Sequence, residues 1–114
     1  MTVLIVEDEL HGRETLRDLL EDEGYHVAIA RDGREAMAHL AAHGTSLVIL
    51  DLLMPGMSGT VLYDEMQRSP ELARIPVLVM TADPTRAPVG VPTIEKPIKV
   101  DKLLSLVALV HGRT

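Results

Sequence analysis

Short apolar runs rich in Val, Ile and Leu alternate with helical patterns along the whole chain. The apolar runs predict strands at residues 2–6, 27–29, 46–50, 75–80 and 92–95. Strands that alternate with helices in this way are typical of parallel sheets built from right-handed βαβ units, with helices on both faces. The expected fold is therefore an α/β domain around a five-stranded parallel sheet.

The segments between the strands carry helix start and stop signals. Polar caps and turn residues predict, in chain order, a stop at Gly24, a cap at Asp32, a stop at Gly44, a cap at Ser58 and a stop at Pro70. A last helix is expected from about residue 99 to residue 111, because its apolar positions repeat at helical spacing.

Length and composition restrict the classes of protein to consider. The chain has 114 residues, so we expect one domain, residues 1–114, and its 46% hydrophobic residues are enough for a core. It has no cysteine, which excludes disulfides and thiolate chemistry. No apolar run is long enough for a membrane span, and we expect a cytoplasmic protein with no membrane contact. The net charge of −6 argues against direct binding of nucleic acid.

Polar side chains follow four of the five predicted strands, at the point where each strand ends. Glu7 and Asp8 follow the first strand, Asp51 the third, Thr81 the fourth, and Lys96 the fifth. The carboxyl ends of parallel strands face the same way, and ligands bind in the crevice outside them. We therefore expect these side chains to converge on one site.

The three acids of this set suit a small, hard cation. Glu7 and Asp8 facing Asp51 across a crevice would supply oxygen ligands and concentrated negative charge, which Mg²⁺ prefers. Three clustered carboxylates without a cation would repel one another. The sequence therefore predicts a Mg²⁺ site.

With a metal bound, Asp51 could act as a carboxylate nucleophile toward a phosphoryl group, because carboxylates form acyl phosphates. Phosphoryl transfer chiefly needs positioning and charge neutralisation. Lys96 could neutralise one phosphoryl oxygen, and the Thr81 hydroxyl or the Ala82 backbone N–H could donate to another.

At this point the residues resemble a known family, the receiver domains of bacterial two-component response regulators. The resemblance covers the whole chain, and the run from Asp51 to Gly59, DLLMPGMSG, is its most specific part. It implies a flavodoxin-like (CheY-like) doubly wound sheet with strand order 2-1-3-4-5. It also makes Asp51 the phosphoacceptor, Asp8 a direct Mg²⁺ ligand, Glu7 a ligand through water, and the carbonyl of Leu53 a further metal ligand.

The same resemblance assigns roles to residues beyond the metal. Thr81 would be the switch hydroxyl and Lys96 the phosphate-binding amine, with a cis peptide between Lys96 and Pro97. Leu53 and Asp83 would tune hydrolysis of the phosphoryl group. The implied partners are a sensor histidine kinase or phosphotransfer protein and a downstream output protein or domain, and a homodimer is left open. The protein would be a switch with weak self-phosphorylation and autodephosphorylation, and not an enzyme in its own right.

The chain departs from the family pattern at three places. Thr93 stands where the family usually has the aromatic partner of the switch hydroxyl, and Ile98 replaces the usual Phe after Lys-Pro. The stretch between Thr81 and Lys96 is shorter than usual by roughly two helical turns. It also contains three prolines, each costing about 3 kcal/mol inside a helix. We therefore predict a shortened or absent fourth helix, with the 82–92 loop as the movable element.

Two other functions compete with this interpretation. A pseudo-receiver would keep the fold as an interaction module without phosphorylation, although the complete acidic pocket argues against it. A phosphatase resembling the haloacid dehalogenases, or a flavin binder, could use the same scaffold. The phosphatases usually place a second Asp two residues after the nucleophile, where this chain has Leu53.

His39 and His43 form a separate pair at i, i+4 spacing and could in principle share a metal. No third ligand is in view in the sequence, and a solvated helix face accounts for both residues. The pair is therefore not assigned a function from the sequence.

Overall fold

The structure is a computed structural model that describes residues 2–54 and 58–111. Its strands are β1 (Thr2–Val6), β2 (Val27–Ala30), β3 (Thr45–Asp51), β4 (Val77–Thr81) and β5 (Thr93–Glu95). Its α-helices are α1 (Leu10–Asp22), α2 (Gly33–Ala42), α3 (Gly59–Arg68) and α4 (Val100–His111), and two short 3₁₀ turns are η1 (Leu72–Arg74) and η2 (Pro84–Arg86). None of the helices in these ranges is long and apolar enough to cross a membrane.

All five strands are parallel and lie in the order β2-β1-β3-β4-β5. This confirms both the predicted class and the predicted order. Strands β3 and β4 run one residue further than expected, so that each ends on a polar residue. Residues at the carboxyl ends of neighbouring strands pair in register: Val6 with Leu50, Asp51 with Met80, and Thr81 with Glu95. The register therefore brings these strand ends to one edge of the sheet.

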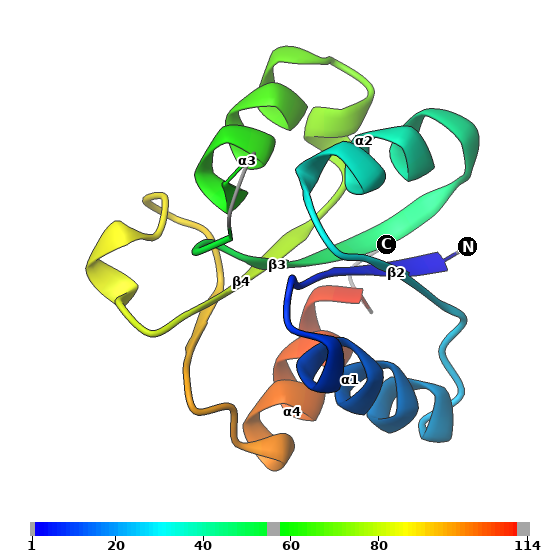
Figure 1. Ribbon diagram of the computed structural model, residues 1–114, viewed down its shortest axis with the longest axis vertical. Coiled ribbons are helices and arrows are strands. Elements are labelled where there is room, and N and C mark those ends of the chain that lie inside the picture. Colours follow the sequence, from blue (N-terminus) through cyan, green and yellow to red (C-terminus); the bar gives the residue numbers. More distant parts are fainter. Residues whose placement is uncertain (1, 55–57, 112–114) are drawn as a thin grey trace.

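Helices cover both faces of the sheet: α2 and α3 lie on one face, and α1 and α4 lie on the other (Figure 1). Alternate residues of β1 point to opposite sides, with Leu4 and Val6 in one core and Val3 and Ile5 in the other. Strand β3 is buried along its whole length. Burial on both faces explains why these strands are continuous apolar runs.

The predicted N-caps are confirmed by the hydrogen bonds that they make. The Asp32 carboxylate accepts from the backbone N–H of Glu35 at 2.9 Å, and the Ser58 hydroxyl accepts from that of Val61 at 3.3 Å. Each bond satisfies an N–H that the first helical turn leaves without a partner.

The predicted stops are confirmed only in part. Gly24 follows α1 with a φ of +93°, a left-handed conformation that glycine adopts without a steric penalty. Helix α2, in contrast, ends at Ala42, and His43 is already extended. Gly44 is not a left-handed helix terminator but leads into β3, and its carbonyl accepts from Thr2 at 3.4 Å.

The segment between β4 and β5 contains no α-helix, as predicted. It forms only the turn η2, capped by the Asp83 carboxylate, and then a loop in which Gly90 has a φ of +80°. The three prolines of this segment remove backbone donors and obstruct helical packing, which is the physical reason for the missing helix.

Helix α3 begins in very close contact with the end of β3. The N–H of Gly59 donates to the Leu52 carbonyl at 3.0 Å. A Cβ atom at position 59 would lie 2.6 Å from the Leu52 Cα and closer still to the Asp51 carbonyl oxygen. Only glycine fits this contact, which holds the start of α3 against the end of β3 at Asp51.

Candidate functional site

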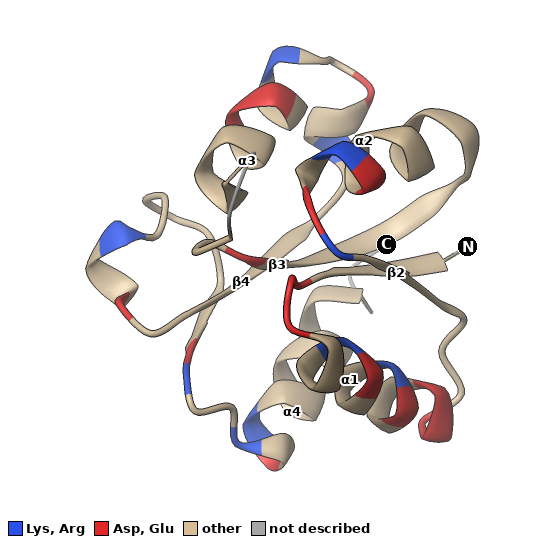
Figure 2. Ribbon diagram, viewed as in Figure 1, with Lys and Arg blue, Asp and Glu red and all other residues tan. Residues whose placement is uncertain are grey.

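The carboxyl ends of the strands bring three acids together. Carboxylate oxygens of Glu7, Asp8 and Asp51 all lie within 4.8 Å of one another. Glu7 and Asp51 are only 4% and 3% exposed, whereas Asp8 is on the surface. Figure 2 shows the acidic segments that follow β1 and end β3 meeting at this edge. The predicted convergence of the three acids is thus present in the structure.

Lys96 lies between the two buried acids. Its Nζ is 2.9 Å from Glu7 Oε1 and 3.1 Å from Asp51 Oδ2. Burial lowers the pKa of this amine, but its bonds to Glu7 and Asp51 outweigh burial and leave the pKa above its ordinary value. The ammonium therefore supplies a positive charge between the two buried acids.

The Asp51 carboxylate is held at both oxygens. Oδ2 pairs with Lys96, and Oδ1 accepts from the backbone N–H of Leu53 at 3.2 Å. The Leu53 side chain itself is 48% exposed. A carboxylate oriented in this way presents a defined face to an incoming electrophile.

The surroundings of Glu7 and Asp8 disfavour the ionised forms of both carboxyls. Burial, and next the neighbouring Asp51 carboxylate, raise the pKa of Glu7 above its ordinary value, although Lys96 opposes the shift. Burial and the Glu7 carboxylate raise the pKa of Asp8. A site with concentrated negative charge and only oxygen donors suits a hard dication such as Mg²⁺, which would offset that charge.

Thr81 is completely buried at the end of β4, and its hydroxyl is hydrogen-bonded to the segment that follows β4. Oγ1 donates to the Asp83 carbonyl at 3.3 Å and accepts from the Asp83 N–H at 3.1 Å. The Thr81 carbonyl accepts from the N–H of Lys96 at 2.9 Å, which ties the ends of β4 and β5 together. The predicted switch residue is thus at the site, with its hydroxyl bonded to the segment after β4.

Three further predicted residues lie in or next to β4 and β5. Ala82 directly follows β4 and is exposed. The Asp83 carboxylate accepts hydrogen bonds from Thr85 and pairs with Arg86 at 3.4 Å. Thr93 opens β5, and its hydroxyl donates to the Val91 carbonyl at 2.9 Å. The peptide between Lys96 and Pro97 is cis, as the resemblance implied.

The role of the Leu53 backbone carbonyl as a metal ligand stays a prediction. The part of the DLLMPGMSG run at residues 55–57 lies outside the described residues.

Arg13 supports the acidic loop and was missed in the sequence. Its Nη1 donates to the backbone carbonyls of Glu7 at 3.1 Å and Asp8 at 2.8 Å. Glu9, in contrast, caps α1 through the N–H groups of His11 and Gly12 and is not one of the clustered acids. A basic residue one turn into the helix after an acidic loop is the only sequence signal for such a clamp.

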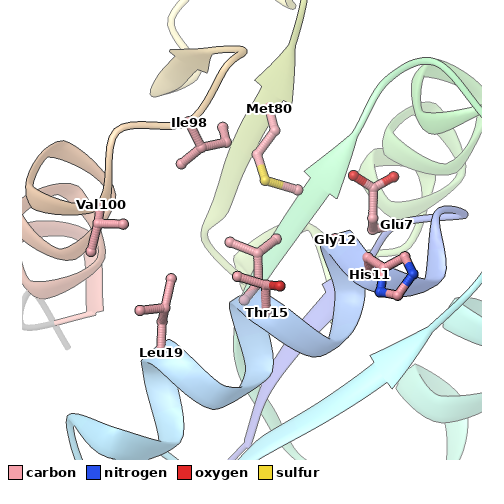
Figure 3. Close-up of a pocket in the computed structure, with 9 residues that line it drawn as sticks. Glu7, His11, Gly12, Thr15, Leu19, Met80, Ile98 and Val100 are labelled. Carbon is pink, nitrogen blue, oxygen red and sulfur yellow. The ribbon is translucent and has the colours of Figure 1, made fainter.

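A largely apolar pocket of about 280 Å³ opens beside the acids, between α1 and the start of α4 (Figure 3). Glu7 lies at one end, and Gly12, Thr15, Leu19 and Ile98 contribute to its wall. A Cβ on Gly12 would lie 3.2 Å from Glu7 Oε1, so glycine leaves room at this point. The pocket therefore places an apolar cleft next to the acidic site.

Comparison with known proteins agrees with this arrangement. RegX3, a sensory transduction protein of Mycolicibacterium smegmatis, is 38% identical over 81 residues, which are 71% of this chain and 34% of RegX3. The chain thus spans about a third of the length of this relative.

Solved structures match over nearly the whole chain. The receiver domain of a signal transduction histidine kinase from Syntrophus aciditrophicus is 35% identical, with a TM-score of 0.89, covering 99% of this chain and 93% of that one. TrrA of Thermotoga maritima, solved in complex with Mg²⁺ and BeF, is 29% identical with a TM-score of 0.85, covering 96% and 97%. The family described as the response regulator receiver domain matches residues 3–108, and the chain belongs to this family.

Proposed function

We propose that this chain accepts a phosphoryl group on Asp51 from a phosphohistidine donor and changes conformation in response. The observation that carries the proposal is the Glu7–Lys96–Asp51 arrangement, in which one amine orients a buried carboxylate beside two further acids. A purely structural role gives no reason to bury two carboxylates that raise each other's energy.

In the proposed reaction an Asp51 carboxylate oxygen attacks the phosphorus of the donor. A P–O bond forms, the P–N bond to the donor imidazole breaks, and the electron pair of that bond leaves with the imidazole. The charge that develops on the phosphoryl oxygens would be neutralised by Lys96, by the Ala82 N–H and by the Thr81 hydroxyl.

Mg²⁺ fits the oxygen donors of this site, and it would supply the remaining positive charge. Glu7, Asp8, Asp51 and the Leu53 carbonyl would hold it, with Glu7 acting through water. The Mg²⁺–BeF complex of TrrA supports this part of the proposal, because that protein is 29% identical over nearly the whole chain. Within the described residues, Glu7, Asp8 and Asp51 are the acids that meet the geometric requirement for a metal.

The partners are also part of the proposal. We expect a sensor histidine kinase or phosphotransfer protein as donor, with the exchange taking place in the cytoplasm, and an output protein or domain as the recipient of the signal. Val89, in the 82–92 loop, is fully exposed, and Leu109 of α4 is 54% exposed. Both are available for contact with an output partner.

The test is phosphorylation by acetyl phosphate in the presence of Mg²⁺, followed by intact mass spectrometry. Asp51→Asn should abolish the added phosphate, because the amide is not a nucleophile. Asp64→Asn, at an exposed position of α3, is the matched control and should be phosphorylated like the parent. Undiminished phosphate on Asp51→Asn would place the acceptor elsewhere, and no phosphate on the parent would favour the pseudo-receiver.

A further inference from the structure

His39 and His43 lie far from the phosphoacceptor, around the end of α2. Helix α2 starts after the carboxyl end of β2 and ends before the start of β3, so its last turn lies at the opposite edge of the sheet from Asp51 (Figure 1). The two imidazole rings are stacked, with centroids 4.7 Å apart and planes inclined by 29°.

A solvated helix face, the interpretation suggested by the sequence, does not account for His39. Its Nε2 is buried and has no hydrogen-bond partner within the described part of the chain. Burial, and next the neighbouring His43, lower the pKa of His39 below its ordinary value. A buried polar atom without a partner calls for an explanation, and an ion is one of the established ones. A neutral imidazole is also the form that binds metals.

We propose that His39 and His43 form a second metal site that binds a divalent transition metal such as Zn²⁺, Ni²⁺ or Cu²⁺ through two imidazole nitrogens, with water completing the coordination. Imidazole suits these borderline ions, whereas Mg²⁺ prefers oxygen ligands. The site is therefore chemically distinct from the acidic cluster.

The ring separation is compatible with one shared ion. A metal–nitrogen bond of about 2.0–2.1 Å places the ion roughly 3 Å from each ring centre. Two ring centres 4.7 Å apart then subtend an angle at the ion of roughly 95–100°. That angle lies between square and tetrahedral coordination.

Binding requires the rings to turn but not to separate. The Cβ–Cγ bond of histidine points through the ring centre, so rotation about this bond turns the nitrogens while the ring centres stay in place. Rotation of both rings out of the stacked arrangement is therefore the motion that the proposed site requires. Both residues keep their positions one helical turn apart, where their side chains are neighbours.

The electrostatics of this position favour a cation. The last turn of a helix carries the negative end of the helix macrodipole. His43 itself is exposed, which gives an ion access from solvent. Bridging residues 39 and 43 would also link the final turn of α2 to the residue that follows it.

The experiment is a calorimetric titration of the full chain with Zn²⁺ in excess Mg²⁺, which keeps the acidic cluster occupied. The variants are His39→Gln and His43→Gln, and His26→Gln, at an exposed position before β2, is the matched control. Loss of an outer-shell partner already costs about 10–100-fold in metal affinity, so loss of a ligand should cost at least as much. We expect one Zn²⁺ per parent chain, at least tenfold weaker binding in both variants, and unchanged binding in the control.

Two results would overturn the site. One is parent-like Zn²⁺ affinity in His43→Gln, a variant at an exposed position whose fold circular dichroism can verify. The other is Zn²⁺ uptake that disappears in Asp51→Asn but persists in both histidine variants, because the ion would then belong to the acidic cluster. Backbone NMR shifts confined to α2 on addition of Zn²⁺ would support the proposal.

Discussion

Lys96 Nζ lies 3.1 Å from Asp51 Oδ2, and the same amine is 2.9 Å from Glu7, so a single positive charge is shared by two buried carboxylates. The Lys96 side chain is 31% exposed, whereas the acidic side chains are almost inaccessible. Without a metal, this amine is the main counterion of the pair.

Lys96→Met should therefore destabilise the metal-free protein. Removing one partner of a buried pair costs about 3–5 kcal/mol, and partial exposure of Lys96 reduces the expected loss to about 1–3 kcal/mol. Mg²⁺ should restore most of the loss, because it supplies the missing positive charge. Urea unfolding with and without Mg²⁺ measures both effects. Lys99→Met, at an exposed neighbour, is the control, and equal losses in the two variants would contradict the shared-charge interpretation.

Gly59→Ala should disturb the phosphoacceptor from the side of α3. Alanine is favoured over glycine in a helix by about 1 kcal/mol, but the new Cβ would collide with the backbone at Asp51 and Leu52. Overpacking of this kind costs about 1–3 kcal/mol, so the net effect should be destabilising. Thermal unfolding and the rate of phosphorylation should both report the change. Thr60→Ala, one residue along the same helix, should leave both values close to those of the parent.

The raised pKa values of Glu7 and Asp8 predict a pH dependence of stability. A carboxyl with a higher pKa in the folded than in the unfolded state binds more protons when folded. The free energy of unfolding of the metal-free protein should thus increase as the pH falls from neutral toward the ordinary pKa of these carboxyls, because the folded state then takes up more protons than the unfolded state. His39, with its lowered pKa, acts in the opposite direction as the pH falls below the ordinary pKa of a histidine.

The measurement therefore compares the parent with Glu7→Gln, which keeps His39 but removes the titrating acid. The increase on acidification should be smaller in the variant. Mg²⁺ requires deprotonated carboxylates, so its stabilising effect on the parent should shrink over the same range. Identical pH dependences in parent and variant would show that Glu7 does not titrate in this window.

Leu53→Asn should shorten the life of the phosphoryl group. Leu53 offers an attacking water no hydrogen bond, whereas an amide can orient one, and a bond worth about 1 kcal/mol corresponds to roughly a fivefold faster loss. The Asp83 carboxylate is engaged with Thr85 and Arg86 and is not poised to compensate. Phosphate loss after removal of the donor gives the rate, with Leu53→Met as the apolar control. An unchanged half-life in Leu53→Asn would contradict the shielding role of Leu53.

Phosphorylation should alter the 82–92 loop through Thr81. If the Thr81 hydroxyl turns toward a phosphoryl oxygen, it gains a hydrogen bond to a charged acceptor, worth about 1.5–3 kcal/mol. It then loses its two neutral hydrogen bonds to Asp83, worth about 0.5–1.5 kcal/mol each. The exchange is close to balanced, so it should shift an existing equilibrium.

Amide hydrogen exchange with Mg²⁺ and beryllofluoride tests this coupling. The parent should show altered protection across 82–92, and Thr81→Val, which lacks the hydroxyl, should show much less change. Protection near Asp51 should appear in both proteins and serves as the control for binding. Unchanged protection of the loop in the parent, despite clear protection near Asp51, would mean that the signal leaves by another face.

The sequence alone determined the sheet, its strand order through the family resemblance, the missing helix after β4, and the set of polar residues at the strand ends. These features follow from local patterns: apolar periodicity, prolines, and the shared direction of parallel strands. Three acids near one lysine could be predicted because each of these residues lies within two positions of the end of a strand.

Only the tertiary structure decided how those residues contact one another. The Lys96 amine contacts both Glu7 and Asp51, Arg13 bonds the backbone of the acidic loop, and Gly59 packs closely against the end of β3. All three contacts depend on how separate elements are placed relative to one another. The engagement of Thr81 with Asp83 and the burial of His39 Nε2 depend in the same way on side-chain packing. Sequence periodicity records which face a residue occupies, whereas these contacts arise from the relative placement of elements and rotamers, which no local pattern encodes.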